Sequence, residues 1–217
     1  MFDYLCVHPL HDDTDGVAML RLNLGCGGKI YEGWVNVDKY DHYAVDVVHD
    51  LEIFPYPFED NSCNEIYMNH VLEHLGSSTD VFNNIMKELY RVCCHDAVIR
   101  INVPHPRHDN FLSDPTHVRP INQGVISLYD KQKNLEWEAM GAANTPLGLL
   151  LDVDFRIEES VLNVEDKYRQ QLADGIISED QLMEMISERN NICSEIRIVV
   201  RVRKPDNHDD DTLTNNA

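Results

Sequence analysis

Apolar residues occur along the chain in short runs separated by polar and turn residues, a pattern that predicts strands of a sheet. The runs lie at 19–24, 34–37, 44–49, 65–69, 97–103, 155–164 and 195–203. The early runs are short and strand-like, and they end at turn or loop residues such as the glycines after Leu24, Asp38, Asp50 and Pro104. The last two alternate between apolar and polar residues, which indicates an antiparallel pair. The pattern therefore predicts seven strands.

Helices are predicted between the later strands. The clearest helical periodicity follows Thr79, a predicted N-cap, with apolar residues at Val81, Phe82, Ile85, Met86, Leu89 and Tyr90. Short helices are predicted at 121–130 and 131–141, and two more at about 165–174 and 179–189. Ser178 and Gln181 form a capping box at the start of the last one. Strands that alternate with helices indicate an α/β domain.

A glycine-rich turn joins the first two strands. The first strand runs into LNLGCGG at 22–28, and the second strand ends on an acid in WVNVD at 34–38. Glycine has no Cβ, so such a turn adopts positive φ and lets a ligand approach the backbone closely. Ten residues separate Gly27 from Asp38, too few for both the second strand and an ordinary helix of about 11 residues. The first crossover is therefore predicted to be a turn.

The words LNLGCGG and VNVD resemble motif I and the second-strand acid of the class I S-adenosylmethionine (SAM) dependent methyltransferases. The resemblance extends over about residues 19–120, and over the C-terminal third through its strand pattern alone. It implies a Rossmann-like α/β fold with a seven-stranded, mostly parallel sheet, an antiparallel last strand and a shortened first helix, in one domain at 1–204. It also implies SAM as the cofactor and methyl transfer to an oxygen or nitrogen of a small molecule, such as a sugar or other metabolite.

The resemblance identifies residues that would hold SAM. Asp38 would accept both ribose hydroxyls, Asp50 would accept from the adenine amine, and Leu51 would pack on the adenine ring. The full set is Asn23, Gly25, Cys26, Gly27, Asp38, Asp50, Leu51 and Asn69.

Two alternatives remain open. The dinucleotide site of an oxidoreductase requires G-x-G-x-x-G, whose third glycine allows close helix–strand packing, but Ile30 occupies that position. SAM has no pyrophosphate, so the glycine turn favours SAM over a nicotinamide cofactor. The other alternative is a non-catalytic protein of the same fold that binds SAM or a partner chain.

The loop at 104–120 contains four prolines and three histidines. A loop of this length in a compact domain is usually functional. Histidine titrates near neutral pH and can remove the proton of a hydroxyl or amine acceptor. His105 and His117 are the predicted bases, and Asp109 is a further catalytic candidate. The opposing interpretation is that Asp114 caps a turn and that the histidines only pack.

The sequence H-x-x-E-H at His70, Glu73 and His74 places three candidate metal ligands on one face of a helical segment. It resembles the E-x-x-E-H metal motif of some methyltransferases that act on RNA ends and on quinone precursors. In those proteins a later histidine completes the site, and His105 is the matching candidate here. V-L-E-H-L is also common in methyltransferases that bind no metal, where the histidine is structural. The sequence favours the structural interpretation, with a divalent metal as the alternative.

Charge and composition narrow the expected partners. The chain has 18 basic and 38 acidic residues, a formal net charge of −20, and such a field repels nucleic acids and anionic membranes. No apolar run approaches the ~20 residues of a bilayer span, and the N-terminus lacks signal-peptide character. We therefore expect a small-molecule substrate, no nucleic-acid or membrane partner, and a cytoplasmic location.

Six cysteines form no C-x-x-C pair, which predicts reduced thiols and no zinc site built from cysteine. Residues 1–16 are predicted to cap one edge of the domain or to fray. The acidic, polar tail at 205–217 is predicted to be disordered.

Overall fold

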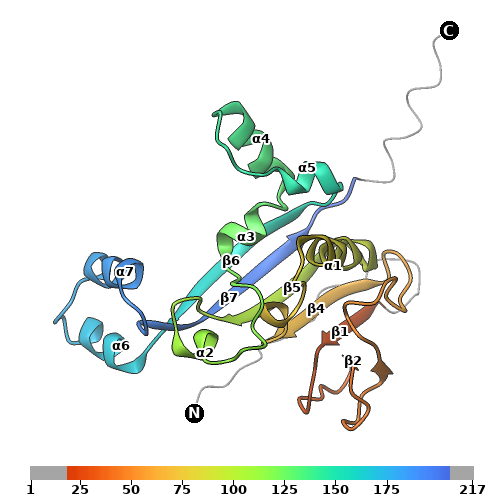
Figure 1. Ribbon diagram of the computed structural model, residues 1–217, viewed down its shortest axis with the longest axis horizontal. Coiled ribbons are helices and arrows are strands. Elements are labelled where there is room, and N and C mark those ends of the chain that lie inside the picture. Colours follow the sequence, from red (N-terminus) through yellow and green to blue (C-terminus); the bar gives the residue numbers. More distant parts are fainter. Residues whose placement is uncertain (1–18, 206–217) are drawn as a thin grey trace.

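The computed structural model describes residues 19–205, which contain a seven-stranded sheet (Figure 1). The strand order is β3-β2-β1-β4-β5-β7-β6. β7 runs antiparallel to both of its neighbours, and the other strand pairs are parallel. The predicted fold class is therefore confirmed. The predictions for 1–16 and for the tail at 205–217 concern residues outside the described part of the chain, apart from Pro205.

The elements follow the order expected of an α/β protein. The strands are β1 (Leu20–Leu24), β2 (Val35–Asp38), β3 (Val47–Val48), β4 (Cys63–Asn69), β5 (Cys93–Pro104), β6 (Phe155–Val164) and β7 (Cys193–Val202). The helices are η1 (Leu72–His74), α1 (Thr79–Val92), α2 (Asp109–Leu112), α3 (Gln123–Ser127), α4 (Lys131–Ala139), α5 (Leu147–Leu151), α6 (Asp166–Ala173) and α7 (Glu179–Glu188).

Helix α1 packs on one face of the sheet, as Figure 1 shows. Its apolar stripe is buried in one core with strand residues such as Leu22, Ile66 and Ile99. The N-cap is Ser78 and not the predicted Thr79: the backbone of Ser78 is extended, and its side chain accepts from the Val81 N–H. The boundary prediction was therefore wrong by one residue, because either neighbouring hydroxyl satisfies the capping rule.

The opposite face of the central strands is polar. Arg21, Glu65 and Arg100 alternate with the buried residues of β1, β4 and β5. The Glu65 carboxylate accepts from Arg21 Nε at 3.3 Å and from Arg100 Nε at 2.9 Å. Parallel sheets are usually apolar on both faces because helices cover both. Here, within residues 19–205, no helix follows β1, β2 or β3 before the next strand begins, so the predicted short first crossover is reduced to turns.

The remaining predicted elements agree with the structure in type and differ in some bounds. Strand β5 begins at Cys93, before the predicted start at residue 97. The third strand, predicted at 44–49, spans only Val47–Val48, because this edge strand pairs with β2 alone. Helices α2 and α5 have no counterpart among the predicted elements, since four and five residues are too few to establish a period. The capping box of Ser178 and Gln181 is present at α7. The cysteines among residues 19–205 are free thiols, and no helix described there is long and apolar enough to cross a membrane.

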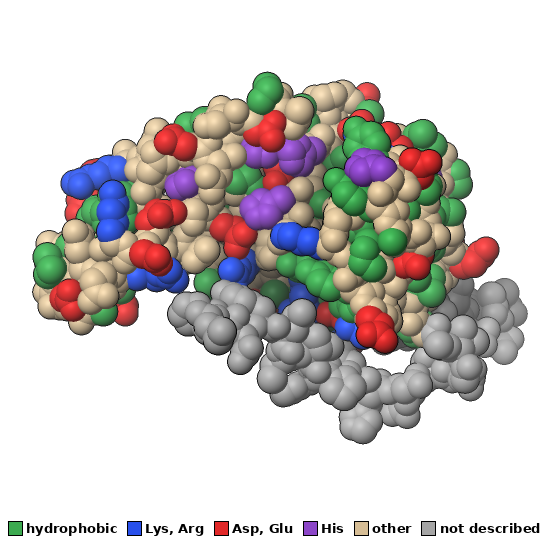
Figure 2. Space-filling view, turned by 90° about the horizontal axis from the view of Figure 1, so that it is seen from below, with side chains coloured by type: hydrophobic (Ala, Val, Ile, Leu, Met, Phe, Trp, Pro, Cys, Tyr) green, Lys and Arg blue, Asp and Glu red, His purple; other side chains and the backbone are tan. Residues whose placement is uncertain are grey.

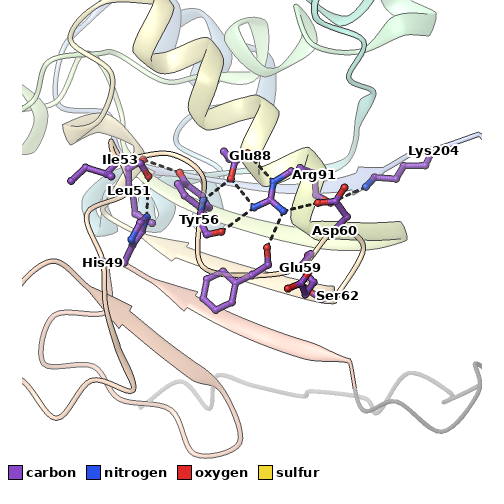
Figure 3. A network of polar contacts seen from close by, with 11 residues as sticks. His49, Leu51, Ile53, Tyr56, Glu59, Asp60, Ser62, Glu88, Arg91 and Lys204 are labelled. Atoms are coloured by element: carbon purple, nitrogen blue, oxygen red, sulfur yellow. Dashed lines mark hydrogen bonds and ion pairs between the residues drawn. The ribbon is translucent and has the colours of Figure 1, made fainter.

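Arg91 of α1 fastens the loop between β3 and β4 to the helix (Figure 3). Its guanidinium donates to both carboxylate oxygens of Glu88, each at 2.8 Å. It also donates to the carbonyl oxygens of Phe58 at 2.9 Å and Tyr56 at 3.1 Å, and to Asp60 at 2.7 Å. One side chain thus satisfies the acceptors of a long loop that has no secondary structure of its own.

Replacing Arg91 with methionine is expected to lower the free energy of unfolding by about 2–3 kcal/mol, because it leaves two loop carbonyls without their side-chain donor and leaves Glu88 with the Tyr56 N–H as its remaining donor. Urea denaturation measures the loss. Arg100→Met is the matched control: it also removes an arginine–glutamate pair, but the Arg100 side chain is 47% exposed against 25% for Arg91. The control should cost less than about 1 kcal/mol. Equal losses for the two variants would show that the network adds nothing beyond a surface ion pair.

Candidate active site

The glycine turn and the acid of β2 meet at the carboxyl ends of β1 and β2. Gly25 and Gly27 have φ of +64° and +51°, the left-handed region that glycine adopts most easily. Asp38 Oδ2 accepts from the Gly27 N–H at 2.8 Å, and Oδ1 accepts from the Tyr40 N–H at 3.0 Å. An ionised carboxylate has about four acceptor positions, so Asp38 retains acceptor capacity for two hydroxyls of a ligand.

The two glycines of this turn have different surroundings. A Cβ on Gly25 would lie 2.6 and 2.7 Å from the two Cγ atoms of Val71, in the loop after β4. A Cβ on Gly27 would meet no heavy atom within 4 Å. Gly25 therefore allows the β1 and β4 loops to pack together, whereas Gly27 borders open space beside the carboxylate of Asp38.

Cys26, between these glycines, is buried. Burial, followed by the charge of Asp38, raises the pKa of its thiol to about 11. The thiol is therefore neutral at physiological pH, and what residue 26 offers a ligand is its backbone.

Asn23 holds the glycine loop in place. Its Nδ2 donates to the Lys29 carbonyl at 2.7 Å and to Asn36 Oδ1 at 2.9 Å, and the Tyr31 N–H donates to the same Oδ1. Both asparagines are buried. The structure thus gives Asn23, predicted as a cofactor residue, a bracing contact to the loop that surrounds the glycine turn.

Asp50, Leu51 and Asn69 lie on the neighbouring loops and strand. Asp50 Oδ1 accepts from the Glu52 N–H at 3.0 Å, as in a tight turn, and Leu51 is buried. Asn69, the last residue of β4, accepts at Oδ1 from the Tyr67 hydroxyl and from Asn102 Nδ2, both at 3.1 Å. The residues proposed for the cofactor therefore come from the carboxyl ends of β1, β2 and β4 and from the loop after β3.

A second group of polar residues lies beside Val71. Glu73, His74 and His117 bring one ligand atom each to within 4.8 Å of one another; we call these three residues the Glu73 cluster. The Glu73 side chain is 1% exposed, and neither of its carboxylate oxygens has a hydrogen-bond partner among the described residues. In Figure 2, histidine side chains gather near the middle of the visible face.

Backbone contacts bring the distant His117 to this cluster. The amides of Val118 and Arg119 donate to the Glu73 carbonyl at 2.9 and 3.2 Å. The Arg119 guanidinium donates to the Gly76 carbonyl at 2.8 Å and lies 4.4 Å from the ring centroid of Phe82. The rings of His74 and His117 meet edge to face with centroids 4.5 Å apart. The segment after 116 is thereby clamped against η1.

His70 lies between Glu195 and Glu73. Its Nε2 lies 3.0 Å from Glu195 Oε2, while Nδ1 lies 3.4 Å from Glu73 Oε1, an attraction without an aligned hydrogen bond. The hydrogen bond to Glu195, followed by the interaction with Glu73, raises the pKa of His70 to about 9. His70 is therefore a cation at neutral pH. The structure brings Glu73, His74 and His117 together as a ligand set, whereas the sequence pattern groups His70 with Glu73 and His74.

His105 and Asp109 lie at the other end of the same loop. His105 Nδ1 accepts from the Arg107 N–H at 3.2 Å. Burial, together with the charges of Arg107 and His108, lowers the pKa of His105. Because Nδ1 accepts a hydrogen bond, the neutral ring carries its proton on Nε2. Asp109 begins α2, and its N–H donates to Asn191 Oδ1 at 2.8 Å. Neither residue belongs to the Glu73 cluster.

Sequence reasoning missed Thr116 and Val71 as contributors to the site. The Thr116 hydroxyl lies 2.9 Å from His74 Nδ1 and 2.6 Å from Asp114 Oδ1. The D-P-T-H word contains the signal for this arrangement, because aspartate before proline favours a turn in which the side chain accepts from the residue two positions on. For Val71 no local signal exists, since its contact with Gly25 joins two separate loops.

The residues present are compatible with SAM. The space that a Cβ on Gly27 would enter is open, and the carboxylate of Asp38, which accepts from the Gly27 N–H, borders it. Asp50 and Leu51 lie on the next loop, where the resemblance places the adenine. When bound, SAM supplies a methyl group that its sulfonium activates for displacement.

No family model matches the chain, and no curated protein matches it. Solved structures do. A SAM-dependent methyltransferase from Archaeoglobus fulgidus is 16% identical, with a TM-score of 0.51 over 85% of this chain and 87% of that one. YcgJ from Bacillus subtilis is 13% identical (TM-score 0.48; 88% and 94% covered), and a SAM-dependent methyltransferase from Mesorhizobium loti is 16% identical (0.45; 87% and 93%).

At 16% identity, the similarity to the Archaeoglobus protein supports a shared fold and does not identify the reaction. The seven-stranded order with its antiparallel β7 agrees with that likeness. The chain has the fold of the class I SAM-dependent methyltransferases.

Proposed function

We propose that this protein is a SAM-dependent methyltransferase that acts on an oxygen or nitrogen atom of a small molecule. The observation that carries the proposal is the glycine turn itself. The Gly27 N–H of the turn donates to Asp38 at the end of β2, but no helix begins after the turn within residues 25–34. A dinucleotide site needs that helix, because its N-terminus binds the pyrophosphate. A cofactor without phosphate, such as SAM, needs only the turn and the acid.

The chain's own residues have three tasks in such a reaction. Asp38 and the loop around Asp50 bind and orient the cofactor. The residues beyond Val71 receive the acceptor, whose lone pair forms the new bond to the methyl carbon as the bond to sulfur breaks and its electron pair stays on sulfur. The acceptor's proton is lost on the side of the site where the Glu73 cluster lies, and it passes to water.

The insertion between β6 and β7 lies at the same end of the sheet as the loop at 104–120. Pro104 at the end of β5 pairs with Glu195 near the start of β7, so α6 and α7 lie at the carboxyl end of β5, close to α2 (Figure 1). The guanidinium of Arg107 donates to the Ser187 carbonyl, and the Asn191 N–H donates to the Arg107 carbonyl at 3.0 Å. These bonds tie the loop at 104–120 to the insertion and border the acceptor side.

Isothermal titration calorimetry with SAM, S-adenosylhomocysteine and NADH on the wild-type chain tests the proposal. We expect micromolar binding of the first two ligands and none of NADH. Turnover is then measured as S-adenosylhomocysteine release on a panel of hydroxyl and amine acceptors. A folded protein that binds neither SAM nor its product would refute the assignment. Binding without turnover on any acceptor would favour a non-catalytic role for the same site.

A further inference from the structure

The carboxylate of Glu73 lacks the partners that a buried charge requires. Its side chain is 1% exposed, and both oxygens are without hydrogen bonds among the described residues. An ionised carboxylate removed from water without partners costs several kcal/mol, so buried charges are paired or bind metals. The closest cation, His70, is 42% exposed and directs Nε2 to Glu195, so it compensates Glu73 only through the contact at 3.4 Å.

Hydrogen bonds fix the proton positions of both neighbouring imidazoles. His117 Nδ1 lies 2.8 Å from the Phe111 carbonyl, which can only accept, so Nδ1 carries the proton. The Thr116 hydroxyl gives its single proton to Asp114 Oδ1 at 2.6 Å. Its oxygen therefore accepts from His74 Nδ1 at 2.9 Å. In their neutral forms, His74 and His117 both have an unprotonated Nε2.

These Nε2 atoms are the ring nitrogens left for an ion, and each ring brings one nitrogen to within 4.8 Å of the other ligand atoms of the cluster. His74 Nε2 is 4.0 Å from Glu73 Oε1, and His117 Nε2 is 3.8 Å from Asp114 Oδ2. Histidines that bind metals typically donate their other ring N–H to a carbonyl, a carboxylate or another fixed acceptor, as both do here. The two histidines are thus oriented as ligands before any ion arrives.

We propose that Glu73, His74 and His117 bind a divalent transition-metal ion, which holds an oxygen atom of the methyl acceptor. Two imidazoles and one carboxylate suit Zn²⁺, Mn²⁺, Fe²⁺ or Co²⁺ better than Mg²⁺, which prefers oxygen ligands. Ligand atoms at about 2.1 Å from one ion lie at most about 4.2 Å apart. The spread of 4.8 Å therefore closes with side-chain movements below about 1 Å.

Three protein ligands leave coordination positions open for a substrate, as in catalytic metal sites. The role of the ion in the reaction rests on the proposed function. Val71, which contacts the glycine turn, is two residues from Glu73, so an oxygen on the ion would lie on the side of the site that faces the cofactor loop. Coordination lowers the pKa of a bound hydroxyl, so its proton passes to water and the oxygen lone pair attacks the methyl carbon. The inference narrows the acceptor to an oxygen compound.

Zinc titration of the full, metal-stripped chain tests the site, with calorimetry and metal content as readouts. We expect the wild type to bind one Zn²⁺ at this site and the variants Glu73→Gln and His117→Asn to bind none there. Zn²⁺ affinity should fall about 10–100-fold in Thr116→Val, which removes only the group that orients His74. His105→Gln and His95→Gln should bind as the wild type does. Mn²⁺ should compete with Zn²⁺, and Mg²⁺ should not.

Melting temperatures separate this site from a plain ion pair with His70. At 100 times its Kd, Zn²⁺ should raise the Tm of the wild type by about 5–10 °C and leave that of Glu73→Gln unchanged. Without metal, Glu73→Gln should melt no lower than the wild type, because it removes a buried charge whose contact with His70, at 3.4 Å, is not an aligned hydrogen bond. Lower stability of metal-free Glu73→Gln, together with no zinc shift in the wild type, would make Glu73 a counter-ion of His70 and overturn the inference.

Different results would refute the proposed function and the proposed metal site. SAM binding with no zinc site refutes the metal and leaves the methyltransferase standing. Zinc binding without SAM binding refutes the methyltransferase and leaves the site. Equal zinc binding in the wild type and all variants would assign the ion to other histidines of the chain and overturn the inference.

Discussion

Replacing Gly25 with alanine is expected to lower the free energy of unfolding by about 3–4 kcal/mol. Alanine at φ +64° costs about 1–2 kcal/mol because it lies in the left-handed region. The new Cβ would also meet Val71 at 2.6 Å, and Val71 is a buried β-branched side chain with little freedom to turn away. Thermal and urea denaturation measure the loss, which corresponds to a fall in Tm of about 6–16 °C for a chain of this size.

Other glycines of the same conformation provide the controls. Gly33 has φ +76°, and a Cβ added there would meet nothing within 4 Å, so Gly33→Ala should cost only the backbone strain, about 1–2 kcal/mol. The double variant Gly25→Ala, Val71→Ala should recover part of the loss of Gly25→Ala, because it removes the clash. Equal destabilisation by Gly25→Ala and Gly33→Ala would refute a packing role for Gly25.

Asp38→Ala is expected to weaken SAM binding by about 100-fold or more. Two hydrogen bonds from ribose hydroxyls to a carboxylate contribute about 1.5–3 kcal/mol each, and every 1.4 kcal/mol corresponds to a factor of ten in Kd. The substitution also frees the amides of Gly27 and Tyr40, which Asp38 holds in the ligand-free protein, so the turn becomes less ordered. Calorimetric titration with SAM measures the change.

Asp46→Ala is the matched control for Asp38→Ala. Asp46 Oδ2 accepts from the backbone and side-chain amides of Asn36, both at 2.8 Å, so it braces the same strand without a hydrogen bond to Gly25, Cys26 or Gly27. We expect its SAM affinity to stay within about threefold of the wild type. If both variants lost SAM binding equally, Asp38 would be acting through the stability of β2 and not through contact with the ribose.

The sequence contained enough local information for the glycine turn, the acid of β2 and helix α1. Each depends on neighbouring residues: glycines where positive φ is required, or apolar residues at helical spacing. The absence of a first helix also followed from the ten residues between Gly27 and Asp38. Residues that decide these elements lie within a few positions of one another, so their physical causes are visible in one stretch of sequence.

The third member of the Glu73 cluster, His117, was not predictable in this way. His74 and His117 are far apart in sequence and meet because two backbone amides donate to the Glu73 carbonyl, an interaction that any residue type can make. The resemblance to metal-binding methyltransferases, in which a later histidine completes the site, instead indicated His105. The turn at Asp114 and Thr116 instead folds the loop back so that His117 reaches η1.

The loops from Gly25 to Ser62 contain no helix, and this changes what a bound cofactor means for the molecule. In an ordinary α/β domain, crossover helices order the loops at the edge of the sheet, and a ligand then enters a finished site. Here the order of the β1–β2 edge depends on a few bonds such as those of Asp38 and Asn23. Under the proposed function, a cofactor bound at this edge would stabilise loops that crossover helices stabilise in other α/β domains. A substitution that weakens the local stability of this edge would then also weaken the affinity for the cofactor, so the two properties would evolve together.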